Sequence, residues 1–138
     1  MTRAAFPSMI ATSWGHSAIS ALAAGTKGER GCAAYCASKA VLIGLSKATA
    51  VKGAPYGISC VSINPSWGET PMMESAVDRF AMAKGITRDA ARAAISASNP
   101  QGRIVQPEEV AAMVDCFCAK AAPGLTNDDI QINAGADW

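Results

Sequence analysis

The run "ISCVSI", residues 58–63, decides the fold class of this chain. It is a short, mostly apolar stretch, and such runs are typical of strands that are buried on both faces of a parallel sheet. The Asn64-Pro65 pair that follows ends the run sharply. We therefore predict a central parallel strand here, which must be joined to its neighbour through a crossover helix.

The helix that precedes this strand is predicted over residues 35–52, where apolar side chains recur at spacings of three and four. Upstream of it, "SMIATS" at residues 8–13 is a short apolar run, and we predict a buried strand there. Strand, helix and strand form a right-handed βαβ unit, and open sheets of this kind bind ligands beyond the carboxyl ends of their strands. Ser13 and the loop after Asn64 are therefore expected at one binding edge.

Three more helices and a third strand are predicted in the second half of the chain. Thr70 and Pro71 have the residue types of an N-cap and a first helical position, and Thr87 is a plausible cap for "RDAARAAISAS". The segment "QPEEVAAMVDCFCA" repeats the design with proline first, and Ile130 and Ile132 alternate with polar neighbours as in a strand. The fold class is therefore α/β, a Rossmann-like three-layer α/β/α arrangement with about three parallel strands.

The composition of the chain indicates one domain and excludes several classes of partner. The chain has 138 residues, half of them hydrophobic, which suits one domain. Twelve basic residues against eleven acidic ones leave a formal charge of +1 and no basic run, so we expect no nucleic acid partner. No apolar run approaches the ~20 residues of a membrane-spanning helix. Polar residues and a proline interrupt the N-terminal stretch, so we predict a cytoplasmic protein without a secretory signal.

The cysteine pattern favours reduced, buried thiols. The count is odd and no C-x-x-C spacing is repeated, as expected of a cytosolic protein without a disulfide framework. His16 is the only histidine, and no four-ligand set suggests itself, so we predict no metal site. The five cysteines are Cys32, Cys36, Cys60, Cys116 and Cys118.

The segment "YCASK" carries the candidate chemistry. Tyr35 and Lys39 stand four residues apart, so a helix would place them on one face. A neighbouring cation favours the phenolate, and we expect Lys39 to lower the pKa of Tyr35 and make it a general acid/base. The glycines of "GTKGERG", residues 25–31, do not follow a strand as a dinucleotide fingerprint would. A solvated loop is favoured there over a phosphate cradle.

Four motifs in this order resemble the C-terminal half of the short-chain dehydrogenase/reductase family. "YCASK" matches its Tyr-x-x-x-Lys motif in full, and "NPSWGETPM" (64–72) is similar to its Asn-Pro-Gly segment. "NPQGRIVQPEEVA" (99–111) is similar to its helix entry with arginine and Pro-Glu-Glu-Val, and "DDIQINAGA" (128–136) to its closing strand. The resemblance implies that residues 1–138 form a single, partial NAD(P)-binding Rossmann-like domain that contains the catalytic half.

The resemblance also implies roles for individual residues. Tyr35 would exchange the hydroxyl proton, Lys39 would bind the nicotinamide ribose, and a serine would hold the substrate oxygen. Ser13 is favoured for that serine because it ends the predicted strand, although it precedes Tyr35 by 22 positions where the family has about a dozen. Ser17 and Ser20 lie closer in sequence and remain alternatives. The implied cofactor-binding residues are Tyr35, Lys39, Pro65, Ser66, Gly68 and Thr70, with Ser66 replacing a glycine of the family.

The implied activity is reversible hydride transfer between NAD or NADP and a secondary alcohol or ketone, in a homo-oligomer. The glycine-rich turn that the family uses for pyrophosphate does not occur in these 138 residues. The upstream acidic or basic residue by which the family selects NAD or NADP is also absent from them, so that choice stays open. The alternative is a non-catalytic remnant that acts in oligomer assembly, or a chain that needs a complementing N-terminal half.

Overall fold

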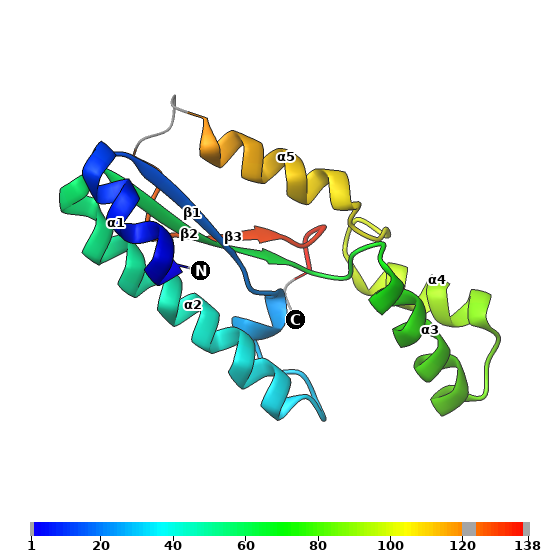
Figure 1. Ribbon diagram of the computed structural model, residues 1–138. Coiled ribbons are helices and arrows are strands. Elements are labelled where there is room, and N and C mark those ends of the chain that lie inside the picture. Colours follow the sequence, from blue (N-terminus) through cyan, green and yellow to red (C-terminus); the bar gives the residue numbers. More distant parts are fainter. Residues whose placement is uncertain (1, 120–123, 137–138) are drawn as a thin grey trace.

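Three parallel strands in the order β1-β2-β3 form the centre of the structure (Figure 1). In this computed structural model, which describes residues 2–119 and 124–136, β1 is Gly15–Ser20, β2 is Ile58–Pro65 and β3 is Asp129–Ile132. Gly15 pairs with Ile58 at one end of the sheet, and Ser62 pairs with Asp129 across the other strand pair. The predicted run "ISCVSI" is therefore confirmed as the central strand.

Strand β2 is covered on both faces, as its sequence predicts. Val61 and Ile63 pack with Phe117 of α5 (Pro107–Cys118), while Cys60 lies 3.5 Å from the Ser46 hydroxyl of α2 (Ala33–Gly53). Phe117 has 0% of its surface exposed. Helices α2 and α5 thus lie on opposite sides of the sheet, and the expected three-layer α/β/α class is confirmed (Figure 1).

A polar contact joins α2 to β2 and β3. The Asp129 carboxylate accepts a hydrogen bond from the Ser62 hydroxyl at 2.7 Å and forms an ion pair with the Lys47 ammonium at 2.7 Å. Partial burial works against ionisation, but the hydrogen bonds from Lys47 and Ser62 prevail and lower the pKa of Asp129. This contact fixes the register of α2 along β2 and β3.

Helices α3 (Pro71–Lys84) and α4 (Arg88–Ser98) pack on one another and form an apolar cluster of their own. Thr70 and Thr87 cap them, as predicted, by accepting hydrogen bonds from the amides of Met73 and Ala90. The cluster contains Met73, Val77, Ala81, Ala91, Ile95 and Ile104, with Trp67 and Phe80 packed against it. The α3–α4 pair therefore has a core distinct from that of the sheet (Figure 1).

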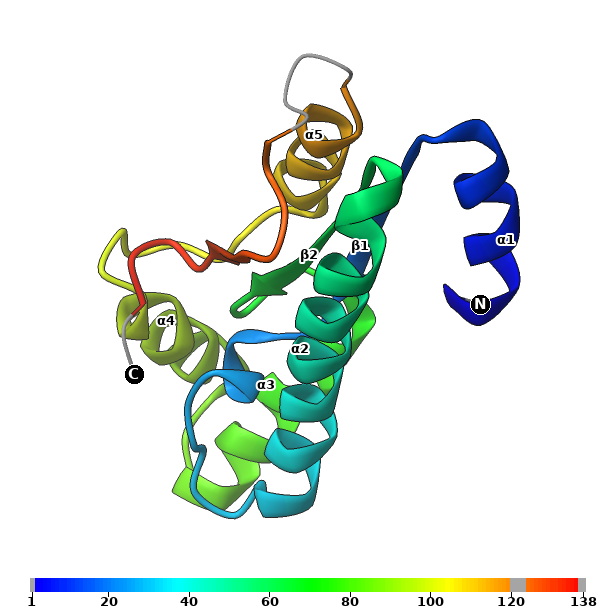
Figure 2. The same ribbon diagram turned by 90° about the vertical axis from the view of Figure 1, so that its left-hand side faces the viewer.

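The strand predicted at residues 8–13 is wrong. These residues belong to helix α1 (Thr2–Thr12), and the strand that precedes α2 is β1, which starts at Gly15. Phe6, Met9 and Ile10 have helical spacing: Phe6 is buried, and Met9 lies so close that a side chain on Gly15 would clash with it. Figure 2 shows α1 set apart at the side of the molecule away from α3, α4 and α5.

The cysteine prediction holds only in part. The described cysteines are free, but only Cys60 is buried; Cys32 and Cys36 are half-buried, and Cys116 and Cys118 are exposed. Within residues 2–119 and 124–136, no helix has the length and apolar character that crossing a bilayer requires.

Candidate active site

The N-terminal part of α2 carries Tyr35 and Lys39 on one face, as the four-residue spacing predicts. The Lys39 ammonium lies over the Tyr35 ring, with Nζ 5.5 Å from the ring centroid. Such a cation–π contact favours the bound ammonium by about 0.5–1 kcal/mol at an exposed site. In Figure 1 the start of α2 lies on the side toward which the β2 arrow points, which is the binding edge of an open parallel sheet.

The pKa of Tyr35 is raised, so the lowering expected from Lys39 is wrong. Partial burial of the phenol is the largest cause, and the negative charge of Glu29 adds to it, followed by Cys32 and Cys36. Each of these disfavours the phenolate. The Tyr35 hydroxyl is therefore protonated at neutral pH and is suited to donate its proton.

The connection from β1 to α2 brings a short 3-10 turn against Lys39. This turn, η1 (Ala23–Gly25), packs so closely on α2 that a Cβ on Gly25 would lie 2.8 Å from the Lys39 carbonyl carbon. Residues 26–31 that follow are exposed, as predicted for a solvated loop. Close packing against α2 therefore requires a glycine at position 25, whereas Gly28 has open space around it.

Four of the six predicted cofactor-binding residues lie at the end of β2 or in the loop that follows it, while Tyr35 and Lys39 are on α2. Pro65 is its last residue, and the Ser66 amide donates a hydrogen bond to Ile132 at 3.1 Å. Ser66 keeps a φ that is not positive, so it replaces a glycine without backbone strain. Gly68 bridges to Val105, and the Thr70 hydroxyl donates to the Gly68 carbonyl at 3.3 Å while it caps α3. Ser66 to Thr70 form one continuous loop.

Asn64 is a site residue that sequence reasoning used only as a strand terminator. Its side chain is 0% exposed and donates through Nδ2 to the Ser62 hydroxyl at 3.2 Å. Its Oδ1 and the Ser66 Oγ are buried and have no hydrogen-bond partner within the protein. Buried polar atoms are normally paired, so these two are candidates for a hydrogen bond with a ligand or a water; His16 Nδ1 and Asn99 Oδ1 share this property elsewhere in the described residues. A polar residue at the end of a buried strand is the sequence signal that could have identified it.

Ser13 is not placed beside Tyr35. It has a φ of 51° in the turn between α1 and β1, at the amino end of the strand, and its carbonyl oxygen faces Gly57. Ser13 was favoured because it seemed to end a strand, and that reason falls with the strand at residues 8–13. Because residues 8–12 are helical, β1 begins only after Ser13. Ser13 therefore lies at the amino end of that strand and not at the carboxyl end, where it was expected.

The two alternative serines are also not brought to Tyr35. Ser17 lies in the middle of β1 and lines a small cavity with residues of α1 and α2. Ser20 is at the carboxyl end, but it is on the same face of β1 as His16, whose ring contacts Phe117 of α5, so it faces away from α2. A count of about a dozen positions back from Tyr35 reaches Leu22 and Ala23, which carry no hydroxyl.

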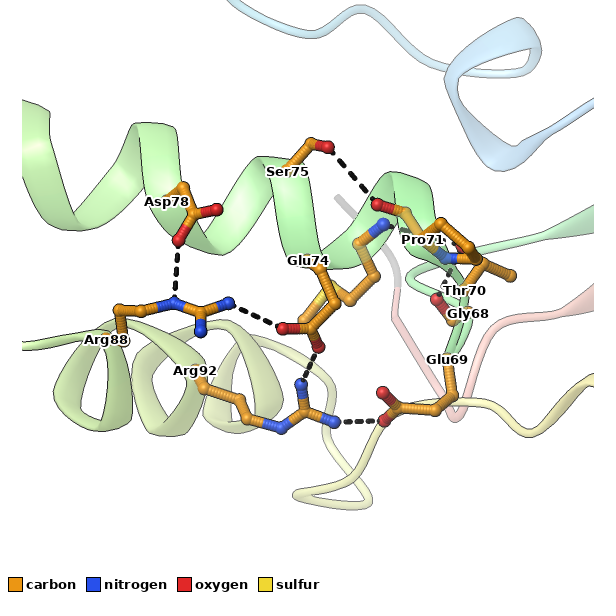
Figure 3. A network of polar contacts seen from close by, with 10 residues as sticks. Gly68, Glu69, Thr70, Pro71, Glu74, Ser75, Asp78, Arg88 and Arg92 are labelled. Carbon is orange, nitrogen blue, oxygen red and sulfur yellow. Dashed lines mark hydrogen bonds and ion pairs between the residues drawn. The ribbon is translucent and has the colours of Figure 1, made fainter.

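A network of ion pairs that the sequence did not reveal lies beside the loop (Figure 3). Arg92 of α4 binds Glu69 of the loop and Glu74 of α3, the latter at 2.5 Å. Arg88 binds Glu74 at 2.7 Å and Asp78 at 2.6 Å. Arg88 is 14 positions from Glu74, and Arg92 is 18 positions from Glu74 and 23 from Glu69, so no local pattern in the sequence connects these partners.

Comparison with known proteins identifies the family. Residues 1–137 match the family model described as "Enoyl-(Acyl carrier protein) reductase". The chain is 31% identical over 122 residues to D-beta-hydroxybutyrate dehydrogenase of Cupriavidus necator, covering 88% of this chain and 47% of that protein. It is 28% identical to nodulation protein G of Azospirillum brasilense, covering 100% of this chain and 52% of that protein.

A solved structure gives the same result. A variant of actinorhodin polyketide ketoreductase with NADPH superposes with a TM-score of 0.88 at 31% identity, covering 93% of this chain and 49% of that one. The chain thus spans about half the length of these relatives. With the family model matched along residues 1–137 and the α/β fold in common, this chain belongs to the short-chain dehydrogenase/reductase family.

Proposed function

We propose that this chain is the catalytic part of an NAD(P)-dependent oxidoreductase that interconverts a secondary alcohol and a ketone. The observation that carries the proposal is the pairing of Tyr35 and Lys39 at the start of α2, on the same edge of the sheet as the loop after β2. A proton donor at the binding edge of the sheet is what a carbonyl reduction needs. The names of the relatives, a hydroxybutyrate dehydrogenase and a ketoreductase, favour a hydroxyacyl or ketoacyl compound as substrate.

The residues present fit the nicotinamide end of a dinucleotide. Asn64 Oδ1 and Ser66 Oγ are buried without partners, and the half-buried Gly68 and the exposed Thr70 follow them in the same loop. Lys39 would donate hydrogen bonds to ribose hydroxyls, and Pro65, Ser66, Gly68 and Thr70 would contact the carboxamide side. When bound, NAD(P) would supply or accept the hydride. This supports a cofactor site but does not distinguish NAD from NADP.

In the proposed reaction, Tyr35 carries the proton. In the reducing direction its neutral phenol donates to the substrate oxygen as that oxygen becomes an alkoxide, and in the other direction the phenolate accepts the proton back. The raised pKa of Tyr35 favours the protonated form that reduction requires. Lys39, over the ring, stabilises the negative charge that the phenol acquires when it gives up its proton. We propose no serine for the substrate oxygen, because neither Ser13, Ser17 nor Ser20 lies beside Tyr35.

Fluorescence titration of the purified chain with NADPH and with NADH tests the cofactor half of the proposal. NADPH consumption with a 3-oxoacyl thioester then tests catalysis, with Tyr35→Phe as the inactive comparison that keeps the ring and its contact with Lys39. We expect saturable binding by both proteins and turnover only by the unaltered one. Absence of binding by the chain alone, followed by binding after addition of an N-terminal half from a relative, would show that two parts must combine.

A role in homo-oligomer assembly is a second candidate, because an open apolar groove runs between α1 and α2. Phe6 and Ile10 line it from α1, and Leu45 and Ala48 from α2. Val41 and Leu45 on α2 are exposed, and exposed apolar patches of this kind often mark association surfaces. Light scattering of the unaltered chain and of Leu45→Glu tests it: an oligomer that dissociates on substitution is expected.

A further inference from the structure

The loop that carries Gly68 and Thr70 is held between two parts of the molecule. On one side it continues β2, and on the other it leads into the α3–α4 pair, whose apolar cluster is separate from the sheet core. Two backbone hydrogen bonds tie the loop to the segment after α4: Val105 N to Trp67 O at 3.0 Å and Glu69 N to Val105 O at 2.9 Å. The position of the loop therefore depends on a small number of contacts.

Arg92 adds the side-chain contact that joins this loop to both helices. Its guanidinium reaches Glu69 in the loop with Nη2 and Glu74 on α3 with Nη1, while Arg92 itself belongs to α4 (Figure 3). Its planar fork can bind two carboxylates at once, which an ammonium cannot do with the same geometry. The three side chains are about one-third to one-half exposed, so the pairs are solvated and sensitive to salt.

Arg88 provides an internal comparison on the same helix. It also binds two carboxylates, Glu74 and Asp78, with contacts of 2.7 and 2.6 Å. Both of its partners lie on α3, so Arg88 joins α4 to α3 and does not reach the loop (Figure 3). Of these two arginines, Arg92 alone contacts Glu69.

We propose that Arg92 is a positioning residue, which acts through Glu69 to hold the Gly68–Thr70 segment in the conformation that binds the nicotinamide end of the cofactor. This rests on the cofactor site proposed above. Without Arg92, Glu69 would lose the cation that binds it, while Glu74 would keep its ion pair with Arg88. The loop would then lose its side-chain link to α3 and α4, and the Glu69 carboxylate would face the Glu74 carboxylate without the guanidinium between them. Glu69 lies between Gly68 and Thr70 in sequence, so its displacement moves both residues.

Amide hydrogen exchange at Glu69 measures loop opening without any cofactor. Arg92→Met should speed this exchange by about two- to fivefold, the range that corresponds to an exposed ion pair. Arg88→Met should leave it unchanged, although it removes two pairs of the same kind. Arg92→Lys should give an intermediate rate, and the difference between Arg92→Met and the unaltered chain should shrink in 1 M salt.

NADPH titration of the same variants then measures the consequence for binding. We expect the dissociation constant to rise by a similar factor in Arg92→Met, to recover partly in Arg92→Lys and to stay unchanged in Arg88→Met. Equal effects of Arg92→Met and Arg88→Met on Glu69 exchange, or no effect of either, would overturn the proposal. If the unaltered chain does not bind NADPH, the cofactor proposal fails for this chain, and the exchange rates still decide whether Arg92 positions the loop.

Discussion

The Lys39 ammonium lies over the ring of Tyr35, 5.5 Å from its centroid, in the first turns of α2. The contact is with the face of the ring, while partial burial, Glu29 and the thiols of Cys32 and Cys36 act on the phenol and raise its pKa. Lys39 can therefore stabilise a negative charge on Tyr35, although the phenol keeps its proton at neutral pH.

The first prediction concerns the pH at which Tyr35 loses its proton. The pKa of Tyr35 is raised above that of a free tyrosine, about 10, so the phenol is neutral at pH 7 and loses its proton at a higher pH than a free tyrosine does. Ketone reduction should therefore fall as the pH rises through the pKa of Tyr35. The ultraviolet titration of the unaltered chain minus that of Tyr35→Phe isolates this group from Tyr56. A Tyr35 midpoint below that of a free tyrosine would contradict the prediction.

The second prediction concerns the close contact between η1 and α2. In Gly25→Ala the new Cβ would lie 2.8 Å from the Lys39 carbonyl carbon, and backbone there cannot give way without moving α2 or the turn. We expect a loss of about 1–3 kcal/mol in the free energy of unfolding, as for other overpacked sites. Gly28→Ala, with nothing within 4 Å, should stay within about 0.5 kcal/mol of the unaltered chain in urea denaturation. Equal stability of the two variants would show that the turn does not pack as described.

The third prediction concerns acid stability. Hydrogen bonds from the Arg103 guanidinium and from the Gln106 amide lower the pKa of Glu109 to about 2. Because the folded-state pKa lies below the unfolded-state value of about 4.3, the contribution to stability is full above about pH 5 and disappears as the pH falls toward 2. Glu109→Gln should therefore melt at a lower temperature than the unaltered chain at pH 7, with a smaller difference near pH 3.

Glu108→Gln is the matched control for that experiment. Glu108 stands beside Glu109 in the first turn of α5 and has the same charge near the same helix end. Glu108 takes no part in the bidentate contact with Arg103. The two terminal nitrogens of Arg103 bind the carboxylate oxygens of Glu109 at 2.6 and 2.7 Å. A pH-dependent change of the same size in both variants would assign the effect to the helix end and not to Arg103.

The fourth prediction concerns the packing of α5 on the sheet. Phe117 is 0% exposed and packs on Val61 and Ile63 of β2. Phe117→Ala should lower the free energy of unfolding by about 3–5 kcal/mol, since it removes buried surface and leaves a cavity. Met82→Ala, at a methionine that is 84% exposed, should change it by less than about 0.5 kcal/mol. Urea denaturation measures both, and a small loss for Phe117→Ala would mean that α5 does not cover β2.

Local signals predicted most of the elements correctly. The apolar run from Ile58, the turn residues that end it and the caps Thr70 and Thr87 are signals that act within a few residues, and the structure places β2, α3 and α4 where they indicate. The error at residues 8–13 arose because a short apolar run fits a strand and a helix equally well. Strand β1 has few β-branched residues, and its conformation depends on pairing with β2, a contact that its own sequence does not encode.

The sequence by itself determined that the side chains of Tyr35 and Lys39 pair, because this depends only on residues close to one another in the chain. Four residues on a helix span one turn, so the pairing of their side chains followed from spacing alone. The sign of the pKa shift did not, because it depends on burial and on Glu29 across the loop. The positions of Ser13, Asn64 and Arg92 likewise depended on which strand pairs with which and on where α4 packs. Helical geometry is a property of consecutive residues, whereas desolvation and long-range ion pairs exist only once the chain has folded.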